Sequence, residues 1–297
     1  MSLLPVGMAL AGHPGRWAFF VLLIVLAMLA VVSLRRLSAL NPKSWQVRFA
    51  TPLLFGFWVL LFWELLTQGF DVPKVLLPAP TVVWAALLQG APTLLGDFQQ
   101  TVLHSVLIGL AAGSGLGFVV GVLIDRSPFL QRGLLPVAAL ASTVPLVGVA
   151  PIMVMWFGFD WHSKAAVVVV MTFFPMLVNT LAGLAASGHM ERDLMHSYGA
   201  SYWRTLFSLR IPVALPFLFN ALKINSTLAL IGAIVAEFFG SPVSGLGFRI
   251  STEAARLNMG LVWAAIVVAA VAGSLLYAAL EWIERRSTFW HPSIRMG

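Results

Sequence analysis

The chain has 297 residues, of which 60% are hydrophobic and 10% are charged, and its net charge is +7. This composition excludes an ordinary soluble domain. The absence of cysteine excludes a disulfide framework and a thiolate metal site. No Gly-Lys dipeptide occurs, so a phosphate-binding P-loop is absent and any ATP hydrolysis must come from another chain.

Seven apolar stretches are long enough to cross a membrane as helices, whose backbone hydrogen bonds close internally. The sequence therefore predicts an all-α membrane protein with about seven transmembrane helices. We expect these spans at residues 17–34, 51–70, 101–124, 134–157, 165–186, 217–239 and 261–282.

The first stretch, 17–34, competes with a signal peptide as an interpretation. Arg16 is the one charged residue before it, Arg35 and Arg36 follow it, and no A-x-A cleavage pattern closes it. These flanks favour a retained span whose N-terminus lies outside. The prolines of residues 71–100 then indicate an external segment with short helices along the surface.

The third and fourth spans carry two patterns of small or helix-breaking residues. Glycines recur every four residues on one face of the third span, which lets a neighbouring helix approach closely. Tight packing is favoured over a contact that slides during transport. Prolines in the fourth span predict either an irregular helix lining a pathway or a kinked packing helix. The glycines are Gly109, Gly113, Gly117 and Gly121, and the prolines are Pro136, Pro145 and Pro151.

The segment 189–216 is too polar to lie in a membrane. We expect a short helix over 190–198 that ends at Gly199, because glycine adopts the required turn without strain. Ser201 can cap a second helix, and Pro212 and Pro216 are expected to end it before the next span. Because this segment is also rich in aromatic residues, a helix lying on the membrane surface is the alternative.

Basic residues are distributed unequally between the two sides. With the N-terminus outside, twelve of the 18 Lys and Arg residues fall on the cytoplasmic side and five on the outer side, while Lys223 lies near the inner end of a span. This bias places the segment 189–216 and the C-terminus in the cytoplasm.

Polar residues inside spans are costly and often functional. Glu237 has two interpretations, a pathway or gating role and a structural hydrogen bond to the neighbouring loop. Glu64 is expected to reach toward water, and Lys223 to reach lipid phosphates. The candidate pathway residues are Asn179, Asn225, Ser226 and Glu237.

The spacing within 189–216 resembles the EAA loop of ABC-importer permeases. An acidic residue, Asp193, is followed six positions later by Gly199, and Ile211-Pro212 closes the pattern; Leu194 and Met195 stand where the family usually has alanines. The resemblance implies that this loop docks into the ATPase. The implied coupling residues are Asp193, Leu194, Met195, Gly199, Ala200, Ser201, Ile211 and Pro212.

Six motifs in order extend the resemblance to the permease subunit of the nitrate/taurine/aliphatic-sulfonate branch of type I importers. They are LLPAP (76–80), TVLHS (101–105), PIMVMWFGF (151–159), FFPMLVNTLAG (173–183), the coupling loop, and VAEFFG followed by GLG (235–240, 245–247). The resemblance implies a six-helix core at 51–297 and an additional N-terminal helix and link at 1–50.

The resemblance also implies the partners and the mechanism. We expect an inner-membrane homodimer surrounded by lipid, two cytoplasmic ATP-binding subunits and an extracytoplasmic substrate-binding protein, with no nucleic acid. ATP and Mg would bind the ATPase, and this chain would hold no cofactor. The solute would be sulfonate-, taurine- or nitrate-like, or alternatively a pyrimidine or flavin precursor. An ion-coupled secondary transporter and a membrane anchor are the competing function classes.

Overall fold

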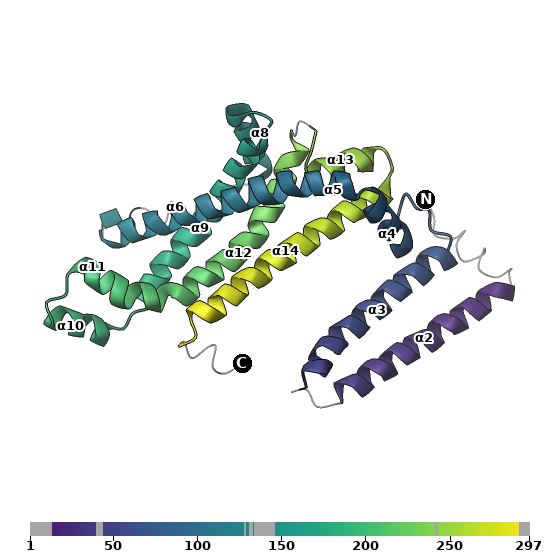
Figure 1. The fold of residues 1–297 in the computed structure, drawn as a ribbon, viewed down its shortest axis with the longest axis horizontal. Helices are drawn as coiled ribbons and strands as arrows, with labels where there is room; N and C mark the ends of the chain where they lie inside the picture. Colours follow the sequence, from purple (N-terminus) through teal and green to yellow (C-terminus); the bar gives the residue numbers. More distant parts are fainter. Residues whose placement is uncertain are drawn as a thin grey trace. The chain divides into compact units, whose positions relative to one another are not determined.

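The computed structural model describes residues 14–39, 44–127, 129–130, 133, 146–240 and 243–290. All regular secondary structure in these ranges is helical, as predicted (Figure 1). Within the described ranges, six helical segments are long and apolar enough to cross a membrane. The chain forms two compact units, one ending at Ala86 and the other beginning at Leu87, and each is described by itself. The predicted division at residue 50 stays a prediction.

The first unit contains α2 (Pro14–Ser38), α3 (Trp45–Gly69) and most of α4 (Pro80–Gln89). Figure 1 shows α2 and α3 side by side. The indole Nε1 of Trp58 donates a hydrogen bond to Ser33 Oγ at 3.1 Å, and the rings of Phe19 and Phe70 meet edge to face. The two helices correspond to the spans predicted at 17–34 and 51–70.

Glu64 joins α3 to the start of α4. Its carboxylate accepts hydrogen bonds from the Thr81 backbone nitrogen at 3.0 Å and the Thr81 hydroxyl at 2.7 Å. Because these hydrogen bonds are exposed and Glu64 is half-buried, the expectation that Glu64 reaches toward water stays a prediction. A carboxylate is stabilised at a helix N-terminus by the unpaired N–H groups of the first turn, which explains this position.

The second unit is built around two long helical segments. The first long segment is Ala91–Asp125, made of α5 (Ala91–Phe98), the π-helical η1 (Gln99–Leu107) and α6 (Ile108–Asp125). The second long segment is Tyr202–Phe238, made of α11 (Tyr202–Thr205), the π-helical η2 (Leu206–Arg210) and α12 (Ile211–Phe238). Both segments begin earlier in the sequence than the predicted spans, because the segments are continuous with the short helices before them.

The remaining helices complete this unit. They are α8 (Leu146–Phe157), α9 (Trp161–Ala185), α10 (His189–Ser197), α13 (Leu246–Ala255) and α14 (Met259–Ser287). The described part of the predicted fourth span is the 12-residue α8, and Pro136 and Pro145 lie outside the described residues. Between the spans predicted at 217–239 and 261–282, the structure has the helix α13.

α9 starts at a helix cap. Asp160 Oδ1 accepts the backbone N–H of Trp161 at 2.7 Å, which satisfies one of the unpaired donors of the first turn. This bond holds the pKa of the Asp160 carboxyl below its usual value. The cap thus fixes where the membrane-spanning helix begins.

The glycine face of α6 packs on α9. A Cβ added to Gly109 would lie 2.6 Å from Val168 Cβ, and one added to Gly121 would lie 2.8 Å from Thr180 Cγ2. One added to Gly113 would lie 2.7 Å from the carbonyl oxygen of Val169. The predicted close approach of a neighbouring helix is confirmed, and the neighbour is α9.

The expectation that Pro212 and Pro216 end the loop helix is wrong. The helix continues from Tyr202 to Phe238 through both prolines. The π-helical turn η2 precedes Pro212, and the N–H of Ile211 bonds to the carbonyl of Leu206, five residues back. Pro212 therefore enters in the first turn after a wide turn, where its missing N–H costs least.

Candidate coupling and transport site

The predicted coupling loop, residues 189–216, forms a helical hairpin in which α10 is followed by α11. The N–H of Gly199 bonds to the carbonyl of His196 at 2.9 Å, and the N–H of Ala200 bonds to that of Met195 at 3.0 Å. This pair of bonds is the Schellman motif, which needs a left-handed residue after the helix, and Gly199 has φ 65°. Ser201 Oγ then accepts the N–H of Arg204 at 3.4 Å. The predicted end of the first short helix at Gly199 and the predicted cap of the second at Ser201 are confirmed.

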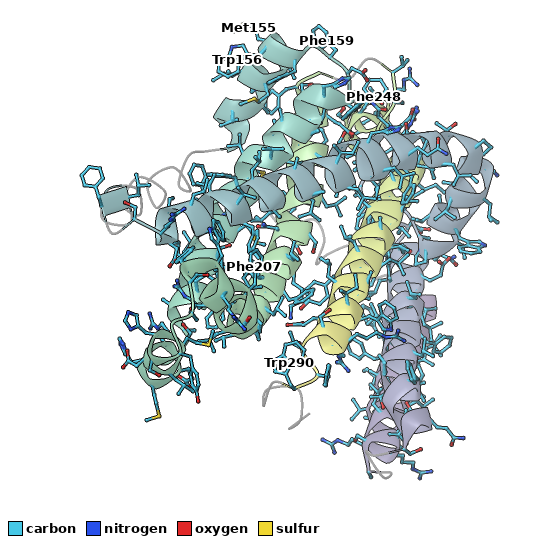
Figure 2. All side chains as sticks on the ribbon, turned by 60° about the vertical axis from the view of Figure 1, so that its left-hand side comes forward. Met155, Trp156, Phe159, Phe207, Phe248 and Trp290 are labelled. Carbon is cyan, nitrogen blue, oxygen red and sulfur yellow. The ribbon has the colours of Figure 1, made fainter. Side chains whose placement is uncertain are left out.

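The hairpin presents an aromatic surface outward. α10 has no buried residue, and the exposed fractions are 83% for Met190, 81% for Tyr198 and 65% for Phe207. Figure 2 shows the side chain of Phe207 at this end of the bundle. Among the eight predicted coupling residues, four are exposed and four are half-buried. The exposed residues are Asp193, Leu194, Gly199 and Ser201. The half-buried residues are Met195, Ala200, Ile211 and Pro212.

A buried ion pair fixes the end of the hairpin to α6. Arg210 donates to both carboxylate oxygens of Asp125, at 2.6 and 2.8 Å, and the side chains are 12% and 4% exposed. Arg210 also donates to the carbonyl oxygen of Leu184 at the end of α9, at 3.0 and 3.2 Å. The Tyr202 hydroxyl contacts the same carboxylate at 3.2 Å. Such bidentate, charge-assisted pairs fix orientation as well as distance.

A polar contact lies halfway along the bundle. The amide nitrogen of Asn225 donates to Ser114 Oγ at 3.0 Å and to the carbonyl of Thr172 at 2.8 Å. Asn225 is fully buried. Ser226, its neighbour, is also buried and donates to the carbonyl of Lys223. Both candidate pathway residues therefore point into the subunit.

A third polar contact involves Glu237, at the other end of α12. Thr101 donates its hydroxyl to Glu237 Oε1 at 2.7 Å, and the N–H of Gly247 bonds to Oε2 at 2.7 Å. The carboxylate is 2% exposed. Gly245 has φ 137°, and a Cβ there would lie 2.6 Å from the carboxyl carbon. The glycines of the GLG motif thus let the loop close over a buried carboxylate, which is the structural hydrogen bond considered as an alternative.

Asp97 extends this outer network. It accepts the N–H of Gly245 at 2.8 Å and pairs with Arg249 at 2.7 Å. Lys164, near the start of α9, is buried and donates to the carbonyl oxygen of Phe159. Sequence reasoning assigned no role to Asp97, Thr101, Asp125 or Arg210. For Asp97 and Asp125, the detectable signal in the sequence was an acidic residue near an end of an apolar stretch.

Two other polar residues have local partners. Asn179 is half-buried and donates to the carbonyl of Pro175 at 2.8 Å. Lys223 pairs with Glu284 of α14 at 2.7 Å, with side chains 19% and 15% exposed. The expectation that Lys223 reaches lipid phosphates is wrong, because Glu284 is a nearer, partly buried partner.

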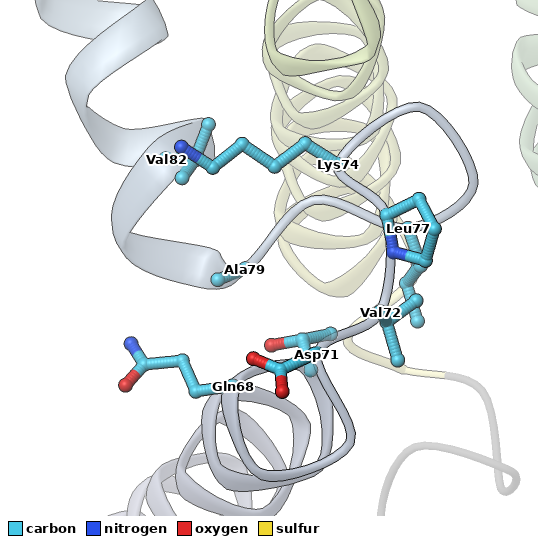
Figure 3. Close-up of a pocket in the computed structure, with 9 residues that line it drawn as sticks. Gln68, Asp71, Val72, Lys74, Leu77, Ala79 and Val82 are labelled. Carbon is cyan, nitrogen blue, oxygen red and sulfur yellow. The ribbon is translucent and has the colours of Figure 1, made fainter.

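In the described part of the chain, neither a metal site nor the cavity of the first unit coincides with the predicted site residues. In the described residues no group of three His, Asp or Glu side chains could hold a metal ion. A cavity of about 380 Å³ in the first unit contains none of the predicted site residues. Figure 3 shows Lys74 extending toward Val82, while Gln68 and Asp71 lie at the end of α3. The second unit is a helical bundle with an exposed hairpin at one end.

Comparison with known proteins identifies the family. The family described as "Binding-protein-dependent transport system inner membrane component" matches residues 113–289. A probable ABC transporter permease from Haemophilus influenzae is 30% identical over 241 residues, covering 81% of this chain and 98% of its own. The formylaminopyrimidine transport permease ThiX of Halalkalibacterium halodurans is 30% identical, covering 80% and 95%.

A third relative and a solved structure agree with this assignment. The taurine transport permease TauC of Escherichia coli is 28% identical, covering 88% of this chain and 96% of its own. A chain of the MetNI methionine ABC transporter, in inward-facing conformations, shares the fold with a TM-score of 0.59 at 18% identity, covering 67% of this chain and 98% of that chain. This chain therefore belongs to the inner-membrane components of binding-protein-dependent transport systems, the permease subunits of ABC importers.

Proposed function

We propose that two copies of this chain form the membrane pathway of an importer that two cytoplasmic ATPase subunits drive and an outer substrate-binding protein supplies. ATP and Mg bind the ATPase subunits, and this chain performs no hydrolysis of its own. Closure of the ATPase dimer draws the two coupling loops together and opens the pathway to the outer side. An element that moves as one body is required for this step.

The observation that carries this proposal is the anchored hairpin. Met190, Tyr198 and Phe207 are exposed on it, while Arg210 ties its end to Asp125 through two short hydrogen bonds. A helix that lay free on the membrane surface would have no need of such an anchor. An exposed apolar surface on a fixed support suits docking against a protein partner.

The candidate residues divide into two proposed roles. We assign the loop residues Asp193 to Ser201 and the Ile211-Pro212 pair to docking and coupling. Asn179 is the candidate pathway residue with a partly exposed side chain, and we assign it to the pathway. Asn225, Ser226 and Glu237 are buried, and we assign them to the frame that holds the pathway helices.

The orientation follows from charge. With the seven predicted spans, twelve of the 18 basic residues fall on the side that carries the coupling loop. This supports a cytoplasmic loop, an outer N-terminus and a cytoplasmic C-terminus. Because the chain has no cysteine, single cysteines at Ser2 and Ser293 can be labelled without background. We expect Ser2→Cys to label from outside and Ser293→Cys from inside, and the reverse result would remove the loop from the cytoplasm.

The solute is a small polar molecule. Relatives are named for formylaminopyrimidine, riboflavin, aliphatic sulfonates and taurine at 30%, 30%, 27% and 28% identity, so identity alone does not separate sulfonates from nitrogen heterocycles. The partner binding protein should be purified and titrated with these four compounds. Binding of one of them assigns the class, and binding of none places the solute outside both classes.

The ATPase assignment has its own test. The chain should be co-expressed with the ATPase subunit, purified through a tag on this chain, and assayed in nanodiscs. We expect the ATPase subunit to co-purify and Mg-dependent hydrolysis to be absent from the chain alone. Robust hydrolysis by the chain alone, free of contaminating ATPase, would contradict the proposal.

A further inference from the structure

Three polar contacts join the same two long helical segments. Thr101 pairs with Glu237 at 2.7 Å, Ser114 with Asn225 at 3.0 Å, and Asp125 with Arg210 at 2.6 and 2.8 Å. We call them the outer, middle and inner cross-links. In each one, the first residue belongs to Ala91–Asp125 and the second to Tyr202–Phe238.

The three cross-links follow one antiparallel register. The position rises from 101 through 114 to 125 in the first long segment, and it falls from 237 through 225 to 210 in the second. At about 1.5 Å per residue, the outer and inner cross-links are roughly 36–40 Å apart along the helices. The cross-links therefore fix the two segments to each other from one end of the bundle to the other.

All three cross-links are shielded from water. Thr101 and Asn225 are fully buried, Glu237 is 2% exposed and the Asp125 side chain 4%. Hydrogen bonds and ion pairs are stronger in such surroundings than in water. A buried polar contact also favours one register of helix packing, as a single buried asparagine does in coiled coils.

α9 is tied into the same frame. The middle cross-link includes the carbonyl of Thr172, and the inner one includes the carbonyl of Leu184, both on α9. The glycine face of α6 lies against this helix. Three helices are thus held together by polar contacts as well as by packing.

The outer cross-link also holds α13. Thr101 Oγ1 accepts the N–H of Leu246 at 2.8 Å, and Glu237 Oε2 accepts that of Gly247 at 2.7 Å. Asp97 adds the ion pair with Arg249 of α13. Arg210 of the inner cross-link belongs to the coupling loop, so the frame connects the loop with α13 at the opposite end.

We propose that Asp125 and Arg210 are positioning residues for transport, which make the two long segments move as one body so that displacement of the coupling loop reaches α13. The inference rests on the proposed ATP-driven function. If the inner cross-link is cut, the loop can still follow the ATPase, but α12 can shift against α6 and the displacement is lost before the outer end.

The test measures both ends of the frame in the complete complex. Spin labels are placed on introduced cysteines at exposed positions, Ser197→Cys in α10 or Ala255→Cys in α13. Distances between the two copies are recorded with and without ATP and vanadate. The parent complex should show a shift at both positions. In Asp125→Asn the Ser197 label should still shift, and the Ala255 shift should fall at least about threefold, within the range by which coupling mutations act.

Glu284→Gln is the matched control. Its partner Lys223 is also in α12 and at 2.7 Å, with a similarly buried geometry, but this pair joins α12 to α14 and leaves the three cross-links intact. Both labels should shift as in the parent. If Asp125→Asn does not assemble, Arg210→Lys retains the charge and loses the bidentate geometry, and the Ala255 shift should again fall.

Each outcome decides the proposal. A full Ala255 shift in a variant of the inner cross-link would overturn it, as would an equal loss in Glu284→Gln. Loss of both shifts in Asp125→Asn would also overturn it, because the pair would then serve docking of the loop. A parent complex that shifts at neither label would contradict the proposed function instead.

Discussion

The hydroxyl of Thr101 donates to the carboxylate of Glu237 at 2.7 Å, and both groups are buried. The same hydroxyl oxygen accepts the N–H of Leu246 at 2.8 Å. One small side chain in η1 thus satisfies polar groups of α12 and α13 that no water can reach.

Replacing Thr101 by valine should therefore destabilise the protein. Thr101→Val keeps the shape but leaves the N–H of Leu246 unpaired and removes one hydrogen bond from Glu237, at a cost of about 1–3 kcal/mol. Thr180→Val is the matched control, because Thr180 is equally buried and its hydroxyl bonds only to the carbonyl of Met176 in its own helix. Thermal unfolding in detergent should show a clearly lower midpoint for Thr101→Val. Equal midpoints for the two variants would contradict the role of Thr101.

The glycine face of α6 gives a second prediction. A Cβ at Gly113 would lie 2.7 Å from the carbonyl oxygen of Val169, whereas one at Gly115 meets nothing within 4 Å. Gly113→Ala should destabilise the bundle by about 1–3 kcal/mol through overpacking. Gly115→Ala should be neutral or stabilising by up to about 1 kcal/mol. Unfolding midpoints compare the two, and a neutral Gly113→Ala would show that α6 and α9 are less closely packed.

Much of the fold and of the coupling loop could be predicted from local sequence, because the signals for them span few residues. Apolar length predicted six spans that the described residues contain, while only the 12-residue α8 of the fourth predicted span is described. The four-residue glycine spacing predicted a close helix contact. The hairpin was predicted because Gly199 and Ser201 act on neighbours within five positions. Such features depend on residues that are close in the sequence, so they form in the same way wherever the segment lies in the packed fold.

The polar cross-links could not be predicted in the same way. Asp125 and Arg210 are 85 positions apart, and Thr101 and Glu237 are 136 apart. Their pairing depends on how the two long segments lie against each other, which no local pattern encodes. Continuity through Pro212 was missed for a related reason: the preceding π-helical turn is set by tertiary packing.

Gly199 gives a third prediction, which concerns coupling. Its φ of 65° is unfavourable for a β-branched residue, while asparagine tolerates it. Nothing lies within 4 Å of an added Cβ, so strain in the backbone is the sole effect. Gly199→Val should assemble with the ATPase but lose stimulation of ATP hydrolysis by the loaded binding protein. Gly199→Asn should keep it. Full stimulation in Gly199→Val would mean that the loop does not couple.

The N-terminal helix gives a fourth prediction. The family match begins at residue 113, and α2 packs on α3 within the first unit through contacts such as Trp58 with Ser33. A chain starting at Pro42 should therefore insert, bind the ATPase and transport, with lower abundance. The measurement is uptake normalised to the amount of complex. A truncated chain that assembles normally yet is inactive would assign α2 a direct role.

The central claim is that this chain is the pathway of an ATP-driven importer. The most direct measurement is uptake into proteoliposomes containing the complex of this chain with its ATPase subunits. The loaded binding protein is supplied outside, and ATP inside. Taurine, an aliphatic sulfonate, formylaminopyrimidine and riboflavin are the labelled probes. We predict that the probe bound by the binding protein accumulates only when ATP and both partners are present. Accumulation by this chain alone, driven by an ion gradient and indifferent to ATP, would contradict the account.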